Sequence, residues 1–300
     1  PVRVIVTSRI TLIDKVSIPR GTTIVRLEEF DEQRRDAWTA VWNDRNGGYF
    51  AETGVRPFRL PANPGITELA AQPLLLLMLA LYDSAANQLS REPDIDQTRL
   101  YDELLTRFIR RELDKDAEGF RKLPAADQRE RLTRELGRLG VAAIGMFNRQ
   151  ALVIRRDEID KDLRYFGAEQ HRPEAGIRPL SQADLLLGSF FFIHESRSRL
   201  AEAPSDQTAG PAAFEFLHKT FGEFLTADFI LRQVIAQAET VAQMASLPGL
   251  SDPLREHLEH LDRNWFGCLV HTPLHTQPNV LDLLREWGGH RLAAGPRSRP

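Results

Sequence analysis

The sequence has little cysteine, no long apolar run and no excess of charge of either sign. Its one cysteine, Cys268, excludes an intramolecular disulfide, and the absence of a CxxC pair argues against structural zinc. The longest apolar run, LAAQPLLLLMLALY at 69–82, is shorter than the ~20 residues that a helix needs to cross a bilayer. We therefore expect no membrane span and a reducing compartment, the cytoplasm.

Acidic and basic side chains nearly balance, 42 against 39, and the formal net charge is −3. A chain of this charge has no bulk basic surface, which argues against nucleic acid or an anionic membrane as a partner. Hydrophobic residues make up 42% of the 300 positions, enough for the core of one large domain or a few small ones.

The sequence also lacks the phosphate-binding motifs of NTPases and a signal peptide. No G-x-x-x-x-G-K-[ST] loop occurs, and no apolar strand ends in paired acids, so these residues supply no phosphate cradle and no Mg²⁺ site. The opening PVRVIVTSRI has neither the basic region nor the cleavage site of a signal peptide. It is typical of a buried parallel strand, which needs neighbours on both sides, so we expect the chain to begin within a domain.

The first part of the chain predicts two strands and two helices. The β-branched run at 2–9 and TTIVRLEEF at 22–30 are strand candidates, and the pattern from Asp31 predicts a helix that Gly47 and Gly48 end. A Pro-rich linker then leads to an apolar helix that starts near Gln72. The polar segment SREPDIDQ at 90–97 fits a domain boundary.

The second part predicts helices followed by a hairpin. TRLYDELLTRFIRRELDK at 98–115 is amphipathic, and further helices are expected at 127–147, 154–166 and 181–187. The apolar face of the first helix comprises Leu100, Leu104, Leu105, Phe108 and Ile109. SFFFIHES and FEFLHKT, at 189–196 and 214–220, resemble the strands of a hairpin with a long tip. Helices followed by such a hairpin are the parts of a winged helix.

Three positions are candidates for a functional role. Arg9, after Thr7 and Ser8 at the end of the first strand, can contact a ligand phosphate, or it is a solvated arginine that ends a strand. Pro73 can press against a flat ligand such as a base, or it starts a core helix. His218, where a strand meets a helix, can donate to an anion, or it is satisfied within the core.

Taken in order, VIVTSR, a strand ending in EEF, a Trp-containing helix, AQPLLLLML, LYDELLTRFIRRE and FEFLHKTFGEFLTA closely resemble the second half of NACHT domains. These domains belong to the STAND class of signal-transducing P-loop NTPases, which are related to AAA+ ATPases. The resemblance covers residues 2–231 and is best to bacterial members. Its most specific part is the run F-x-F-L-H-K-T-F-x-E-F-L-T-A, because order and spacing agree there.

The resemblance implies a role for each candidate. Thr7, Ser8 and Arg9 match the sensor 1 segment, in which the arginine senses the terminal phosphate. Pro73 matches a proline that packs near the adenine, and His218 matches a winged-helix histidine that contacts the β-phosphate of ADP. The implied cofactors are ATP or ADP with Mg²⁺, bound with a phosphate cradle that would precede sensor 1. We expect this segment not to hydrolyse ATP alone.

The implied fold is mainly α. Residues 1–30 would end the α/β core of a P-loop NTPase, 31–90 would form a helical domain, 91–231 a winged-helix domain with a β-hairpin, and 232–300 a further helical region. The implied function is an ATP/ADP-controlled switch in bacterial signalling or antiviral defence, with an upstream effector, a downstream sensor and self-association on activation.

Two alternatives remain open. The chain can be a non-enzymatic helical and winged-helix module that binds a protein partner or DNA. A DNA reader needs a basic recognition helix, yet RERLTRELGRLG and IRRDEIDKDLRYF mix acids with their arginines. The other alternative is a degenerate NACHT-like scaffold, which these residues do not separate from the switch.

Overall fold

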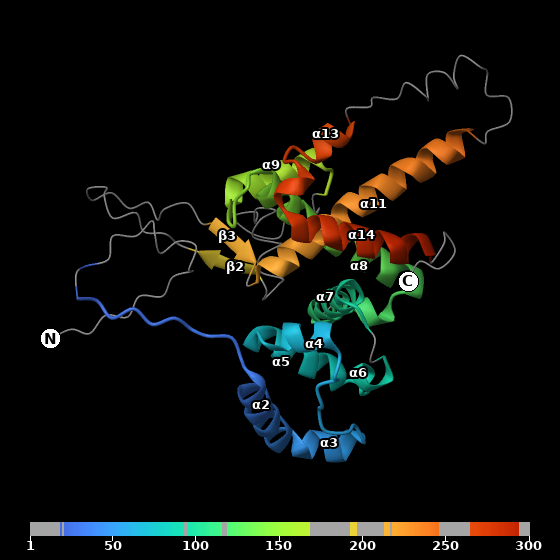
Figure 1. The fold of residues 1–300 in the computed structure, drawn as a ribbon. Coiled ribbons are helices and arrows are strands. Elements are labelled where there is room, and N and C mark those ends of the chain that lie inside the picture. The colour runs from blue at the N-terminus through green and yellow to red at the C-terminus, as the bar shows by residue number, and fades with distance from the viewer. Residues whose placement is uncertain are drawn as a thin grey trace, which may run out of the picture. The chain divides into compact units, whose positions relative to one another are not determined.

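In the part of the chain that the structure describes, the protein is mainly helical with one small antiparallel sheet (Figure 1). The expected mainly α fold class is confirmed at this level. The chain forms two compact units, Pro1–Pro93 and Asp94–Pro300, and the division falls within the polar segment 90–97. The finer assignments, to the end of a P-loop core and to a winged helix, stay predictions. The computed structural model describes residues 19, 21–92, 95–115, 119–168, 193–196, 213–216, 218–245 and 265–293.

The first unit begins with two consecutive helices, α2 (Glu32–Arg45) and α3 (Gly47–Thr53). Asp31 caps α2, because its Oδ1 accepts a hydrogen bond of 2.8 Å from the backbone N–H of Arg34. The glycine pair was expected to end this helix, but Asn46 ends it and the glycines begin α3. The chain leaves α3 at Gly54, whose φ of 70° lies in the left-handed region.

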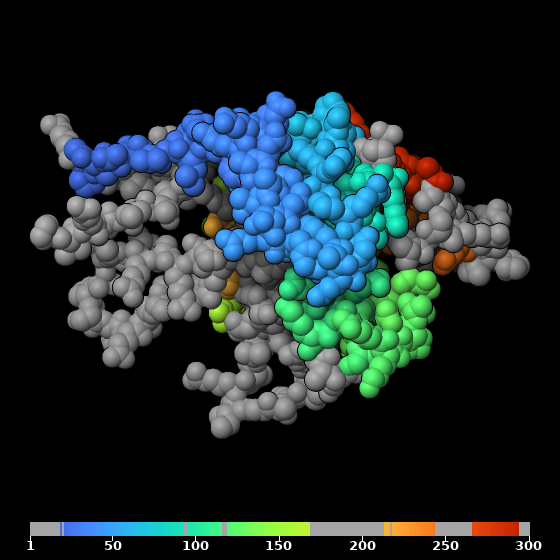
Figure 2. Space-filling view, turned by 90° about the horizontal axis from the view of Figure 1, so that it is seen from below, coloured from blue at the N-terminus to red at the C-terminus, as the bar shows by residue number. Residues whose placement is uncertain are grey.

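The strand predicted at 22–30 is not formed. Its apolar side chains are exposed: Ile24 by 61%, Val25 by 79% and Leu27 by 92%. Figures 1 and 2 show this segment extending away from the helices of the first unit. A β-branched sequence becomes a strand only when a neighbouring strand pairs with it, and none of the described strands does so. The strand prediction for these residues is therefore wrong, whereas the assignment of residues 1–30 to the end of an α/β core stays a prediction.

The core of the first unit lies around α5 (Pro73–Asp83), which is preceded by α4 (Pro64–Ala70) and followed by α6 (Gln88–Arg91). Pro73 occupies the first turn of α5, as predicted, because its missing N–H would have no helical partner there. The buried face of α5 contains Leu75, Leu76, Met78 and Leu79.

Four long helices build the second unit: α7 (Gln97–Asp114), α8 (Ala125–Asn148), α11 (Lys219–Ala245) and α14 (Pro278–Ala293). The prediction for α7 is confirmed, since all five residues of its apolar face are buried. α11 packs against α8 and α14 (Figure 1). A Cβ built at Gly140 of α8 would lie 2.7 Å from Cδ2 of Phe229 on α11, so the two helices pack closely at this point.

The sheet has the order β1-β3-β2, with β1 at Ile154–Arg155, β2 at Ile193–Ser196 and β3 at Ala213–Phe216. β2 and β3 are antiparallel, with Ile193 opposite Phe216, which confirms the predicted pairing. β3 is shorter than predicted because α11 begins at Lys219.

The shorter described elements of the second unit are α9 (Arg156–Tyr165), η1 (Phe120–Lys122), α13 (Trp265–Leu269) and η2 (Leu274–Thr276). Within the described ranges, the helices are too short or too polar to cross a bilayer.

Candidate functional site

His218 lies directly before α11 and caps its first turn. Its ring Nδ1 is 3.3 Å from the backbone nitrogen of Thr220, which donates to it. The side chain is half-buried. A helix start has backbone N–H groups without helical partners, and a side chain that accepts from one of them orients itself at the same time. The position of His218 at the junction of strand and helix is therefore as predicted.

A chain of hydroxyl groups continues from His218 into the core. Thr220 Oγ1 lies 2.7 Å from Nδ1 of His218, and the hydroxyl of Tyr101 donates to the same Oγ1 over 2.8 Å. A backbone N–H can only donate, so Nδ1 is an acceptor and the neutral imidazole carries its proton on Nε2. The arrangement makes Nε2–H the hydrogen-bond donor of the ring, which suits an anionic ligand.

The phenol that supports this chain is inaccessible to solvent. Tyr101 is 0% exposed, and burial raises the pKa of its hydroxyl. Its ring packs against Phe221 and Phe224, with centroids 5.5 and 5.7 Å away. A buried aromatic residue of this kind is held in one position, so the group that it hydrogen-bonds is held as well.

Charged residues of the first turns of α11 lie beside His218. Lys219 Nζ is 3.5 Å from Glu223 Oε1, and the side chain of Lys219 is 57% exposed. Glu223 also accepts from Asn279 at 3.4 Å. Glu223 is thus the ion-pair partner of Lys219 and an acceptor for Asn279.

Pro73 lies in the other unit, and its ring is exposed. Pro73 starts α5, which confirms the prediction that it begins a core helix. Contact of its ring with a base stays a prediction. The neighbouring Gln72 has a side-chain oxygen that is buried and finds no hydrogen-bond partner among the described residues. Buried acceptors of this kind are uncommon in proteins and call for an explanation.

The sensor 1 candidates Thr7, Ser8 and Arg9 lie outside the described residues. Among the predicted site residues, then, the structure places Pro73 and His218, each in its own unit. Sequence reasoning missed Tyr101 and Thr220. Thr220 could have been found from its spacing of two from His218, but Tyr101 lies 119 positions from Thr220 and no local pattern connects them.

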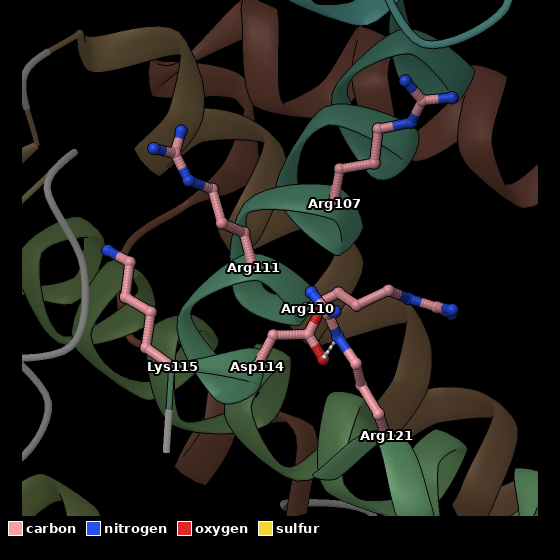
Figure 3. A pocket seen from close by; sticks show the side chains of 6 residues that line it. All are labelled: Arg107, Arg110, Arg111, Asp114, Lys115 and Arg121. Atoms are coloured by element: carbon pink, nitrogen blue, oxygen red, sulfur yellow. Dashed lines mark ion pairs between the residues drawn. The ribbon is translucent and has the colours of Figure 1, made fainter. Parts of the chain in front are cut away.

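A basic hollow lies at the end of α7 in the second unit, with a volume of about 320 Å³. Figure 3 shows its side chains along the last turns of α7, with Arg121 reaching Asp114 from η1. That ion pair is 3.1 Å long, and Lys115 pairs with Glu112 at 2.7 Å. The lining residues are Arg107, Arg110, Arg111, Asp114, Lys115 and Arg121.

Comparison of the chain with models of protein families, with curated proteins and with solved structures found no match. The likeness to NACHT domains therefore stays a prediction that depends on the order and spacing of the sequence motifs.

Proposed function

We propose that this chain is the C-terminal regulatory part of a NACHT-type switch of the STAND class, controlled by ATP and ADP. The observation that supports it most is the hydrogen bond that Nδ1 of His218 accepts from the backbone N–H of Thr220. It assigns the ring proton to Nε2, and an N–H group of this kind can donate to an anionic oxygen. A phosphate of bound ADP supplies such an oxygen. In this proposal His218 is a latch that retains ADP, and it is not a catalyst.

The latch would act through the helix that it caps. His218 accepts a hydrogen bond from the first turn of α11, and α11 packs against α8 and α14. A phosphate held by His218 therefore restrains the main helices of the second unit. Exchange of ADP for ATP would remove this restraint and shift the population to another arrangement, because each nucleotide binds one arrangement better. Self-association and signalling to an effector would follow.

The first unit would contribute to the base. Pro73 offers an exposed ring, against which a flat base can lie. The phosphate cradle, the Mg²⁺ ligands and Arg9 would complete the site, and ATP hydrolysis would belong to the whole protein rather than to this segment.

The decisive test is the rate of ADP release from the full-length protein. Loss of a hydrogen bond to a charged group, worth roughly 1.5–3 kcal/mol, should speed release about 10- to 100-fold in His218→Ala. Basal activity should rise as well, and Arg9→Ala should impair the response to ATP. His271→Ala, which removes an exposed histidine, is the control. Stopped-flow release of a fluorescent ADP analogue measures the rate, and unchanged release in a folded His218→Ala protein would contradict the latch.

The basic hollow favours a second candidate function, a non-enzymatic module that binds nucleic acid. Five of its six lining residues are cationic in a chain of net charge −3. Phosphodiester backbones bind to such clusters, with an affinity that falls as salt rises. Arg110 and Arg111 are the lining residues to replace, because Lys115 and Arg121 already have acidic partners.

Fluorescence anisotropy with a labelled DNA duplex at physiological salt tests this candidate. Arg110→Gln with Arg111→Gln should weaken DNA binding. The slope of the logarithm of the binding constant against the logarithm of the salt concentration should fall by about one for each phosphate that the variant no longer neutralises. The matched control is Arg129→Gln with Arg134→Gln on the exposed face of α8. Binding that is absent, or equally weakened by both pairs, would exclude the hollow as a nucleic-acid site.

A further inference from the structure

Three potential metal ligands meet where the start of α7 lies against α14. Asp96, Glu286 and His290 each offer one ligand atom, and these atoms lie within 4.8 Å of one another. Nε2 of His290 is 2.5 Å from Oδ2 of Asp96. The two residues of α14 are four positions apart, so they project from one face of the helix.

Each carboxylate of this cluster is oriented by a second contact. Oδ1 of Asp96 accepts from the backbone N–H of Arg99 and from Oγ1 of Thr98, both at 2.9 Å, so the other oxygen faces His290. Oε1 of Glu286 lies 3.5 Å from the nitrogen and 3.4 Å from Oγ1 of Thr98. Hydrogen bonds to the outer atoms of ligands are the usual means by which proteins orient metal ligands.

The rotation of α14 is set independently by its buried face. Trp287, between the two ligands in sequence, donates from Nε1 to Oδ1 of Asp228 over 2.8 Å, and Arg291 pairs with the same oxygen at 3.3 Å. Asp228 is 2% exposed. Because these contacts hold one side of α14 against α11, the side that bears Glu286 and His290 keeps its direction toward Asp96.

The three groups of this cluster lie close together. Nε2 of His290 contacts the carboxyl of Asp96, and the ligand atom of Glu286 lies within 4.8 Å of both. Two carboxylates at this separation repel each other when both are charged, and a divalent cation bound between them would offset that repulsion.

We propose that Asp96, Glu286 and His290 form a zinc-type divalent metal site that fastens α14 to the start of α7. One imidazole nitrogen and two carboxylate oxygens are a donor set that Zn²⁺ accepts, with bonds of about 2.0–2.2 Å and a fourth position left for water. Mg²⁺ and Ca²⁺ prefer sites made of oxygen alone. This proposal is independent of the nucleotide switch.

Metal binding by the purified protein, first treated with a chelator, tests the site. Calorimetric titration with ZnCl₂ should show one saturable site that depends on this cluster, and bound Zn²⁺ should raise the midpoint of thermal unfolding. His290→Ala and Glu286→Gln should each weaken Zn²⁺ binding at least tenfold. Asp96 is left unchanged in the decisive variants because it also caps α7.

His275→Ala is the matched control, since it removes an exposed histidine in η2 and should leave zinc affinity unchanged. MgCl₂ should produce no comparable binding. Circular dichroism verifies that each variant is folded. Absence of a saturable Zn²⁺ site, or zinc affinity that is the same in folded His290→Ala and Glu286→Gln as in the original protein, would overturn the proposal.

Discussion

Tyr101 of α7 donates a hydrogen bond of 2.8 Å to the hydroxyl of Thr220 in the first turn of α11. The bond joins positions 119 apart in sequence. It gives the buried phenol of Tyr101 an acceptor, and it supports the hydroxyl that contacts His218. Stability and the orientation of the candidate latch therefore depend on the same pair.

The first prediction concerns the hydroxyl of Tyr101. Tyr101→Phe keeps the packing on Phe221 and Phe224 and removes a net hydrogen bond, so the free energy of unfolding should fall by about 1 kcal/mol. Tyr49→Phe, which removes an exposed hydrogen bond of 3.1 Å to Ser84, should change it less. Urea denaturation compares the two, and equal effects would show that the buried bond contributes no more than the exposed one.

The second prediction is a pH dependence that comes from Asp102. Burial and the nearby charge of Asp228 raise the pKa of Asp102 to about 6 from 3.8. Because the folded pKa is the higher one, the neutral acid stabilises the fold below pH 4, and this contribution is lost as the pH rises through about 6.

Asp102→Asn keeps a neutral polar group at every pH. The free energy of unfolding of the variant, relative to that of the original protein, should therefore be higher at pH 8 than at pH 4. A shift of about two pKa units corresponds to at most roughly 3 kcal/mol. Free energies of unfolding measured across this range test the sign. The control is Asp282→Asn, which replaces a side chain on α14 that is 70% exposed and should change stability equally at both pH values. If the two variants show the same dependence of stability on pH, Asp102 is not the group responsible.

The third prediction concerns Asp228, the buried anion between α11 and α14. Burial disfavours its charge, but the charges of Arg232 and Arg291 and the bond from Trp287 together lower its pKa. Its contribution to stability is therefore present above the unfolded pKa and is lost as the pH falls through the folded one.

Asp228→Asn leaves both arginines, 23% and 19% exposed, without their anion. Removal of one member of a buried ion pair should lower the free energy of unfolding at pH 7 by about 3–5 kcal/mol. Chemical denaturation followed by tryptophan fluorescence measures the loss. A change as small as that in Asp282→Asn would mean that the buried network does not stabilise the fold.

The fourth prediction uses two glycines of α8. Gly137→Ala should stabilise the protein by up to about 1 kcal/mol, because alanine favours helix and no atom lies within 4 Å of the added Cβ. Gly140→Ala should destabilise it by about 1–3 kcal/mol, because its Cβ would lie 2.7 Å from Phe229. Thermal unfolding checks the prediction. The unfolding midpoint should rise in Gly137→Ala and fall in Gly140→Ala, and shifts of the same sign would contradict it.

The sequence by itself determined the elements whose cause is local. The apolar periodicity of α7 and the start of α5 at Pro73 follow from patterns within a few residues, and both are present in the structure. The pairing of β2 with β3 was predicted from two strand-like runs that resemble each other, and it is present as well. The strand expected at 22–30 is absent because its cause would not be local. Strand formation needs a partner, and the local pattern does not provide one.

Only the tertiary structure decided which polar groups meet. The sequence placed His218 at a helix start, but the tautomer of its ring follows from the fold around Thr220 and Tyr101. Glu286 and His290 show the spacing of ligands on one helix face, whereas Asp96 lies 190 positions before Glu286 and joins them only through packing of α14. Residues distant in sequence are brought together by burial of apolar faces, and that packing is cooperative rather than local.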